Sequence, residues 1–124
     1  MPAGKATSER FALVVEDNAR AAEMTAAMLE ANGWRVDMAR DGFEAIMRFR
    51  NKAYGVLLLD YRLPGMDGVE VLAWARRNVA VWPQVLVVSG ESPEFLRHQF
   101  DSMGVRAILP KPLTVQDLLG ALPA

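Results

Sequence analysis

Five residues with chemically active side chains stand at or just beyond the ends of short apolar runs. In order along the chain they are Glu16, Asp17, Asp60, Ser89 and Lys111. Three carboxylates brought close together repel one another unless a cation lies among them. A hard divalent cation that keeps several water ligands, Mg²⁺ above all, meets that need. The sequence therefore predicts a metal site if these residues converge.

Asp60 is the residue best suited to react, because its strand lies in the middle of the expected sheet. A carboxylate oxygen acts as a nucleophile toward phosphorus. The metal ion and Lys111 would neutralise charge on the oxygens of a transferred phosphoryl group, and Ser89 would donate a hydrogen bond to one of them. Together these groups are typical of phosphoryl transfer.

Each residue alone has a simpler structural interpretation. Asp17, or its neighbour Asn18, would be the N-cap of a helix. Asp60 and Ser89 would begin turns, and Lys111 would be solvated. The functional interpretation rests on the combination of these residues, because four of the five apolar runs are each followed by one part of the same site.

The elements that position these residues alternate along the chain. Apolar runs predict strands at 11–15, 34–38, 56–59, 85–88 and 105–109. Helical spacing predicts helices over 18–32, 42–51, from 69 onward, over 92–104 and from 114 to 122. This alternation indicates a parallel sheet covered on both faces. Ligands bind outside the carboxyl ends of such strands, where the polar residues stand.

Apolar side chains at helical spacing are assigned to the core. In the first, second and last helices they are Ala21, Met24, Met28, Phe43, Ile46, Met47, Val115, Leu118, Leu119 and Leu122. All seven methionines are expected to pack inside rather than to bind a cofactor.

Composition excludes several classes of function. The absence of cysteine excludes a disulfide scaffold and a thiol nucleophile, and the single histidine, His98, is expected on the surface. A net charge of −1 argues against a broad basic face for nucleic acid. No apolar run approaches the ~20 residues of a membrane span. Residues 1–10 lack the apolar segment of a signal peptide, so a cytoplasmic location is predicted. The same ten residues are polar and are expected to form a mobile tail.

On these residues the sequence resembles the receiver domains of bacterial two-component response regulators. The resemblance covers residues 11–122, as one domain. It rests on Glu16-Asp17, Asp60, the loop Leu63-Pro-Gly-Met-Asp-Gly68, Ser89-Gly90 and Lys111-Pro112. It implies an α/β, flavodoxin-like three-layer (βα)5 sandwich with a five-stranded parallel sheet of order 2-1-3-4-5.

The resemblance also implies a mechanism of phosphorelay signal transduction. Asp60 would become a 4-aspartylphosphate by taking the phosphoryl group from a phosphohistidine on a sensor histidine kinase or histidine phosphotransfer protein. The Mg²⁺ ligands, with Mn²⁺ as an alternative ion, would be Glu16 (through water), Asp17, Asp60 and the backbone carbonyl of Arg62.

The same resemblance suggests how the signal leaves the site. Ser89 and Lys111 would sense the phosphoryl group and pass the signal to the face formed by helix 92–104, strand 105–109 and the last helix, or the group would be relayed onward. The protein would catalyse only its own phosphorylation and dephosphorylation, so it is not expected to be an enzyme. Neither nucleic acid nor a membrane is an expected direct partner.

Three further expectations concern single positions. Ile108 stands where relatives carry a switching Phe or Tyr, so output is expected to run through residues 89–96 instead. The Lys111-Pro112 peptide bond is expected to be cis, to turn Lys111 back toward Asp60. Arg62 and Glu91 are expected to pair across the mouth of the site and to gate access of water.

Two alternative functions would require different residues from those of a receiver domain. A haloacid-dehalogenase-like phosphatase also uses an aspartyl nucleophile, but it needs a second aspartate two residues later, where this chain has Arg62. A phosphorylation-independent interaction module of the same fold would not need Asp60, Ser89 and Lys111. A dinucleotide site is excluded because no G-x-G-x-x-G follows the first strand.

Overall fold

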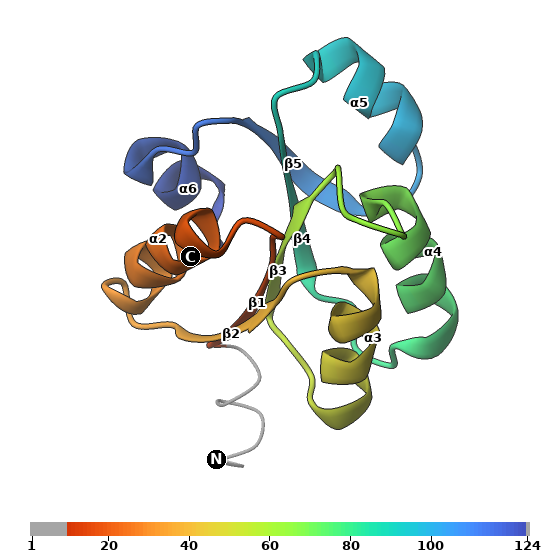
Figure 1. Ribbon diagram of the computed structural model, residues 1–124, viewed down its shortest axis with the longest axis horizontal. Helices are drawn as coiled ribbons and strands as arrows, with labels where there is room; N and C mark the ends of the chain where they lie inside the picture. Colours follow the sequence, from red (N-terminus) through yellow and green to blue (C-terminus); the bar gives the residue numbers. More distant parts are fainter. Residues whose placement is uncertain (1–9, 124) are drawn as a thin grey trace.

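The computed structural model describes residues 10–123 of the chain (Figure 1). The predicted tail, residues 1–10, lies outside this range except for Arg10. Five strands alternate with five helices: β1 (Phe11–Val15), α2 (Ala19–Glu30), β2 (Arg35–Ala39), α3 (Gly42–Asn51), β3 (Val56–Asp60), α4 (Gly68–Asn78), β4 (Gln84–Ser89), α5 (Pro93–Phe100), β5 (Val105–Pro110) and α6 (Val115–Ala121).

The strands form one parallel sheet in the order β2-β1-β3-β4-β5. This confirms the predicted α/β fold and its strand order. Helices α2 and α6 cover one face, and α3, α4 and α5 cover the other (Figure 1). Because β3 is central, its side chains are covered on both faces, and the whole strand from Val56 to Asp60 is buried.

Each helix begins at a residue whose side chain accepts a backbone hydrogen bond from the first turn. These N-caps are Asn18, Asp41, Asp67, Ser92 and Thr114. Asp67 and Glu70 form a reciprocal capping box at the start of α4. The caps fix where the loops beyond β1, β3 and β4 end, and those loops border the predicted site.

The predicted helix over 92–104 is too long, since α5 ends at Phe100. Ser102 and Gly104 both adopt positive φ, of 62° and 73°, which no helix accommodates. Their carbonyl oxygens accept hydrogen bonds from Arg76 and Trp82, at 3.2 Å in each case. Contacts with the end of α4 and the loop that follows it thus outweigh the helical pattern of the sequence.

The prediction that every methionine lies in the core is wrong. Met24 is 57% exposed, and Met38 and Met47 are exposed too. Three other apolar residues assigned to helical core faces, Phe43, Val115 and Leu119, are exposed as well. Strand β2 begins at Arg35 rather than at Trp34, which is buried. Each helix buries a narrow stripe against the sheet; in α2 it consists of the small or branched residues Ala22, Ala26 and Leu29.

A polar pair of one buried and one partly exposed residue lies near the amino end of β3, away from the predicted site. The hydroxyl of Tyr54 donates to Oδ2 of Asp37 at 2.6 Å, and Nζ of Lys52 lies 3.1 Å from the same oxygen. Tyr54 is almost wholly inaccessible, and its ring packs edge-on against Phe49. Among residues 10–123, no helix has the length and apolar character needed to cross a membrane.

Candidate phosphoryl-transfer site

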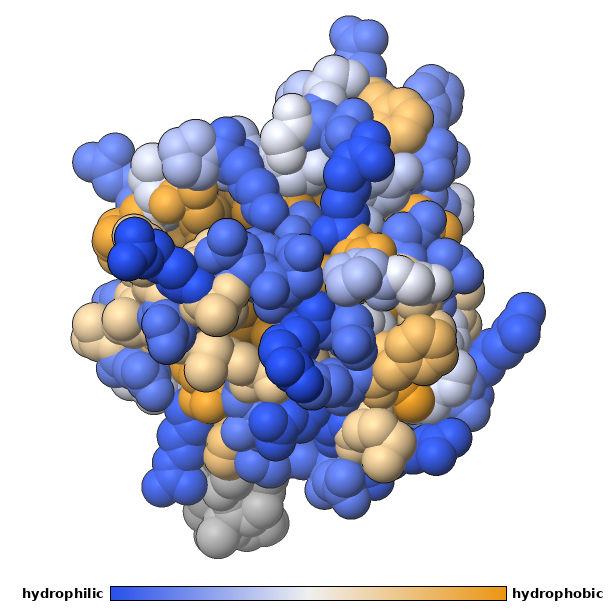
Figure 2. Space-filling model, in the orientation of Figure 1, coloured by the Kyte–Doolittle hydropathy of each residue, from blue (hydrophilic) through white to orange (hydrophobic). Residues whose placement is uncertain are grey.

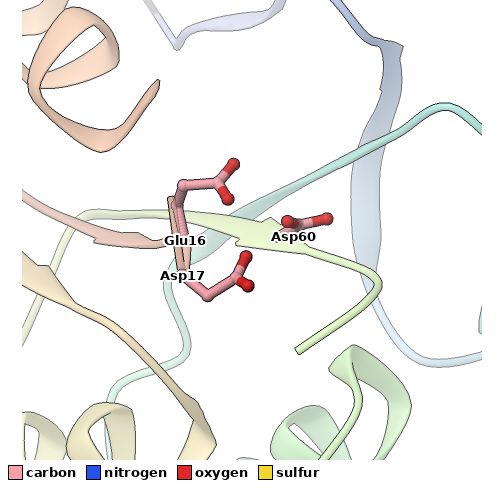
Figure 3. Close-up of side chains that lie close together, drawn as sticks. All are labelled: Glu16, Asp17 and Asp60. Carbon is pink, nitrogen blue, oxygen red and sulfur yellow. The ribbon is translucent and has the colours of Figure 1, made fainter. Parts of the chain in front are cut away.

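Three carboxylates converge at the carboxyl ends of β1 and β3. One oxygen from each of Glu16, Asp17 and Asp60 lies within 4.8 Å of the others (Figure 3). Glu16 and Asp60 are only 8% and 5% exposed, whereas Asp17 is exposed. The adjacent parallel strands bring these residues together, as the sequence predicted.

Local hydrogen bonds fix the acidic pair after β1. The backbone N–H of Glu16 extends the β1–β2 ladder by donating to the carbonyl of Ala39 at 3.0 Å. Asn18, not Asp17, caps α2, because its Oδ1 accepts from the N–H of Ala21 at 2.9 Å. The simpler interpretation of Asp17 as a helix cap is therefore wrong, and its carboxylate faces the cluster (Figure 3).

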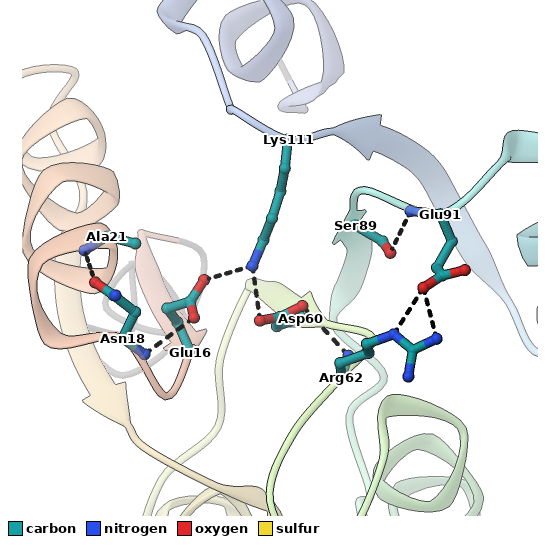
Figure 4. A network of polar contacts seen from close by, with 8 residues as sticks. All are labelled: Glu16, Asn18, Ala21, Asp60, Arg62, Ser89, Glu91 and Lys111. Atoms are coloured by element: carbon teal, nitrogen blue, oxygen red, sulfur yellow. Dashed lines mark hydrogen bonds and ion pairs between the residues drawn. The ribbon is translucent and has the colours of Figure 1, made fainter.

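Lys111 reaches into this cluster from the loop after β5 (Figure 4). Its Nζ lies 2.8 Å from Oδ2 of Asp60 and 3.1 Å from Oε1 of Glu16. The Lys111-Pro112 peptide bond is cis, as expected, and the backbone N–H of Lys111 donates to the carbonyl of Ser89 at 3.1 Å. Although burial alone lowers the pKa of Lys111, hydrogen bonds to the two carboxylates outweigh it, so the net pKa is raised.

Ser89 ends β4 beside Asp60 and is only 4% exposed. Its Oγ accepts a hydrogen bond from the N–H of Glu91 at 3.0 Å (Figure 4). Glu91 in turn holds Arg62, whose Nε and Nη2 both lie 2.6 Å from Oε2 of Glu91. The predicted pair of Arg62 and Glu91 is therefore present.

The donor set fits a hard divalent cation. Three carboxylates face one ammonium group, which leaves an excess of two negative charges when all are ionised. Carboxylate oxygens are the ligands that Mg²⁺ prefers. The backbone N–H of Arg62 donates to Oδ1 of Asp60 at 3.3 Å, so the loop after β3 lies against the same carboxylate.

The chain matches the sequence profile described as the response regulator receiver domain over residues 12–123. The chain belongs to this receiver-domain family. It is a phosphoacceptor module of two-component signalling, with the flavodoxin-like fold that the family shares. The resemblance stated from the sequence is thereby confirmed.

Curated relatives are longer proteins that contain such a domain. The sensor histidine kinase AruS of Pseudomonas aeruginosa is 33% identical over 125 residues, which cover 98% of this chain but 12% of that protein. The transcriptional regulatory protein TctD of Salmonella typhimurium is 33% identical over 106 residues, 86% of this chain and 47% of that protein. The chain thus spans less than half the length of both.

Solved receiver domains superpose over almost the whole chain. A receiver from Bermanella marisrubri is 32% identical with a TM-score of 0.81, covering 90% of this chain and 93% of that one. A Burkholderia pseudomallei response regulator, solved with a phosphorylated aspartic acid and a calcium ion, is 25% identical with a TM-score of 0.82, covering 93% and 67%.

The structure brings the predicted site residues together in two groups. Glu16, Asp17, Asp60 and Lys111 share the acidic cluster, and Ser89 lies beside it in contact with Glu91. Ile108 is half-buried on β5 and packs against the apolar core cluster that includes Phe100. Sequence reasoning missed Tyr61, whose ring packs against two phenylalanines of α5. Its position directly after Asp60 was the available signal.

Proposed function

We propose that Asp60 is the phosphoacceptor of this receiver domain. The observation that carries the proposal is the buried carboxylate of Asp60 at the end of the central strand, 2.8 Å from Nζ of Lys111. An Asp60 oxygen would attack the phosphorus of a phosphohistidine as the P–N bond breaks, and the imidazole would keep the electron pair of that bond. Water attack on the phosphorus would later restore the carboxylate.

The acidic cluster would hold Mg²⁺, or Mn²⁺, through Asp17, Asp60, the backbone carbonyl of Arg62 and, through water, Glu16. The cation, when bound, neutralises negative charge on the phosphoryl oxygens. The calcium ion and phosphorylated aspartic acid of the Burkholderia pseudomallei relative support this assignment.

Two further residues of this chain would bind the phosphoryl group itself. Lys111 would exchange part of its contact with Asp60 for a phosphoryl oxygen. Ser89 would turn its hydroxyl toward another, and its Oγ would then give up the hydrogen bond from the N–H of Glu91. The loop after β4 would thereby sense phosphorylation, and the signal would leave through α5, β5 and α6 or the phosphoryl group would be relayed. Beyond these steps on itself, the protein would act on no substrate.

The phosphoryl donor would be a protein that carries phosphohistidine, because the surface beside the site could bind such a protein. A groove of about 530 Å³ lies between α2 and the loop after β5, and its lining includes Met24, Met28, Leu113 and Lys111. Figure 2 shows apolar surface over α2 and over α3, separated by a hydrophilic band. A histidine kinase or phosphotransfer protein would cover the apolar surface on α2 while its histidine reaches Asp60. The sensor kinases among the relatives support this partner class.

Intact mass after incubation with acetyl phosphate and Mg²⁺ tests the proposal. One added phosphoryl group is expected on the native chain, and none on Asp60→Asn or on the native chain in excess chelator. Asp101→Asn, an exposed position beyond α5, is the matched control and should label like the native chain. Equal labelling of Asp60→Asn would contradict the assignment.

A further inference from the structure

An aromatic side chain joins the phosphoacceptor strand directly to α5. Tyr61 follows Asp60 in sequence, and its ring centroid lies 5.8 Å from that of Phe95 and 5.9 Å from that of Phe100. Both pairs are edge-to-face, with interplanar angles of 78° and 76°. Phe100 is buried, whereas Phe95 is 41% exposed. The ring of Tyr61 therefore touches both the interior and the surface side of the same helix.

The backbone of Tyr61 is held to the two elements that flank the site. Its N–H donates to the carbonyl of Val88 at 3.2 Å, and its carbonyl accepts from the N–H of Gly68 at 2.9 Å. A Cβ on Gly68 would lie 3.2 Å from Cα of Tyr61, so the loop and α4 leave this residue little room. A displacement at Asp60 is thus carried into the ring of Tyr61 rather than absorbed by a loose loop.

Strand β5 offers no comparable link. Ile108 packs in the same apolar cluster as Phe100 but has no ring, and a β-branched side chain on a strand is stiff at its first torsion. The loops after β3 and β4 are also connected by the ion pair of Arg62 with Glu91, in which the Arg62 side chain is largely exposed. Solvent screens such a pair, so it constrains the loops weakly.

We infer that Tyr61 couples the phosphorylation state of Asp60 to the position of α5 through its edge-to-face contacts with Phe95 and Phe100. The inference rests on the proposed function, because it needs a change at Asp60 to transmit. Ser89 and Tyr61 then act on the two sides of the same helix: Ser89 through the loop that starts α5, and Tyr61 through the packing of its ring. Phosphorylation of Asp60 shifts α5 only to the extent that these contacts differ in free energy between the phosphorylated and the unphosphorylated protein.

Amide chemical shifts with and without beryllofluoride and Mg²⁺ test the coupling on the full chain. In the native protein we expect changes at residues 60–62, 89–91 and 111, and along α5. Tyr61→Leu should keep the changes at the site and lose those along α5. Tyr61→Phe retains the ring and should behave like the native protein, since the described hydrogen bonds do not involve the Tyr61 hydroxyl.

Phe95→Leu provides a second test that does not depend on a core position. It removes the outer ring of the contact at a partly exposed site, and it should weaken the response of α5 while leaving the response at the site unchanged. If Tyr61→Leu and Phe95→Leu both keep the native changes along α5, Tyr61 is a packing residue only and the inference is overturned. If the native protein shows no changes at residues 60–62 and 89, the proposed function itself fails, which is a distinguishable outcome.

Discussion

Nζ of Lys111 lies 2.8 Å from Oδ2 of Asp60, although 51 residues separate the two in the sequence. The same nitrogen lies 3.1 Å from Oε1 of Glu16, so two buried carboxylates share one ammonium group, and Asp17 adds a third negative charge to the cluster. An arrangement that gathers like charges costs stability, and it persists where function requires it. The charge balance of this cluster therefore gives the first two predictions.

Asp17→Asn should stabilise the protein when no divalent cation is present. The substitution removes one of three clustered carboxylates, and we expect a gain of about 1 kcal/mol in the free energy of unfolding in chelator. Mg²⁺ should stabilise the native chain but not the variant. Urea unfolding with and without Mg²⁺ measures both effects, with Glu23→Gln on the exposed side of α2 as the control. A variant that is less stable than the native chain in chelator would contradict the prediction.

Lys111→Met should destabilise the protein, because it leaves the buried carboxylates of Glu16 and Asp60 without the ammonium group that pairs with them. The ammonium group is partly exposed and so partly screened, and we expect a loss of about 1–2 kcal/mol without Mg²⁺. The pKa of Lys111 is raised on folding, so its contribution is complete below the pKa of the unfolded chain, about 10.4, and is lost as the pH rises through the folded pKa.

Unfolding midpoints from pH 6 to pH 11 check the sign of this effect. The difference between native chain and Lys111→Met should be constant near neutrality and should shrink only above about pH 10.5. A difference that already shrinks between pH 7 and pH 9 would mean that the ion pair does not hold Lys111 charged.

The pair of Arg62 and Glu91 should affect the lifetime of the acyl phosphate more than folding. Both charges lie beside Asp60, the proposed phosphoacceptor, and the Arg62 side chain is largely exposed, so the pair adds little stability. Arg62→Ala and Glu91→Ala should each change the dephosphorylation rate of the labelled protein. If the two side chains act as one gate, the double variant should resemble the single ones. Additive rates would assign them separate roles, and unchanged rates in all three would exclude the gate.

Gly68→Ala should displace the backbone of Asp60 and Tyr61. A Cβ at this position would lie 3.1 Å from the carbonyl oxygen of Asp60 and 3.2 Å from Cα of Tyr61, and backbone atoms cannot rotate away. We expect a loss of about 1–3 kcal/mol in the free energy of unfolding and slower labelling by acetyl phosphate. Gly120→Ala, where an added Cβ meets open space in α6, is the control and should be neutral or mildly stabilising.

The sequence was sufficient for the sheet and for the acidic cluster, since both follow from short-range patterns. Continuous apolar runs identified the strands, and the rule that parallel strands end at one edge then brought Asp60 and Lys111 together. Asp17 and Asn18 were ambiguous as helix caps, because both side chains suit that position. Only the geometry of α2 decides between them.

What the sequence did not disclose depends on contacts between distant segments. Helix α5 ends early because Arg76 and Trp82 bind carbonyls beyond it, and no local pattern encodes that. Met24 and Met47 stand at helical spacing yet face solvent, because small residues such as Ala26 suffice to cover the sheet. The ring of Tyr61 contacts α5 because β3 lies beside β4 in the sheet, and the periodicity of apolar residues in the sequence does not predict that contact.

The hydrogen-bonded pair of Tyr54 and Asp37 gives the last prediction, which concerns the pH dependence of stability. Burial alone would raise the pKa of Asp37, but hydrogen bonds from Tyr54 and Lys52 outweigh it and the net pKa is lowered. For Tyr54, burial and the bond to Asp37 both raise the pKa well above its usual value. Asp37 therefore contributes stability above the pKa of an unfolded aspartate, about 3.9, and loses it as the pH falls through the folded pKa.

Tyr54→Phe should remove about 1 kcal/mol from the free energy of unfolding near neutral pH, because the hydrogen bond of the buried Tyr54 hydroxyl to the partly exposed Asp37 carboxylate is lost. The difference from the native chain should narrow below about pH 4, as Asp37 becomes protonated. Absorbance at about 295 nm checks the protonation of Tyr54 in Tyr61→Phe, where Tyr54 is the single remaining tyrosine. No tyrosine should ionise at about pH 10, the usual value, while this variant is folded, because the pKa of Tyr54 is raised. Ionisation of Tyr54 at about pH 10 in the folded variant would show that it does not hold its proton for Asp37.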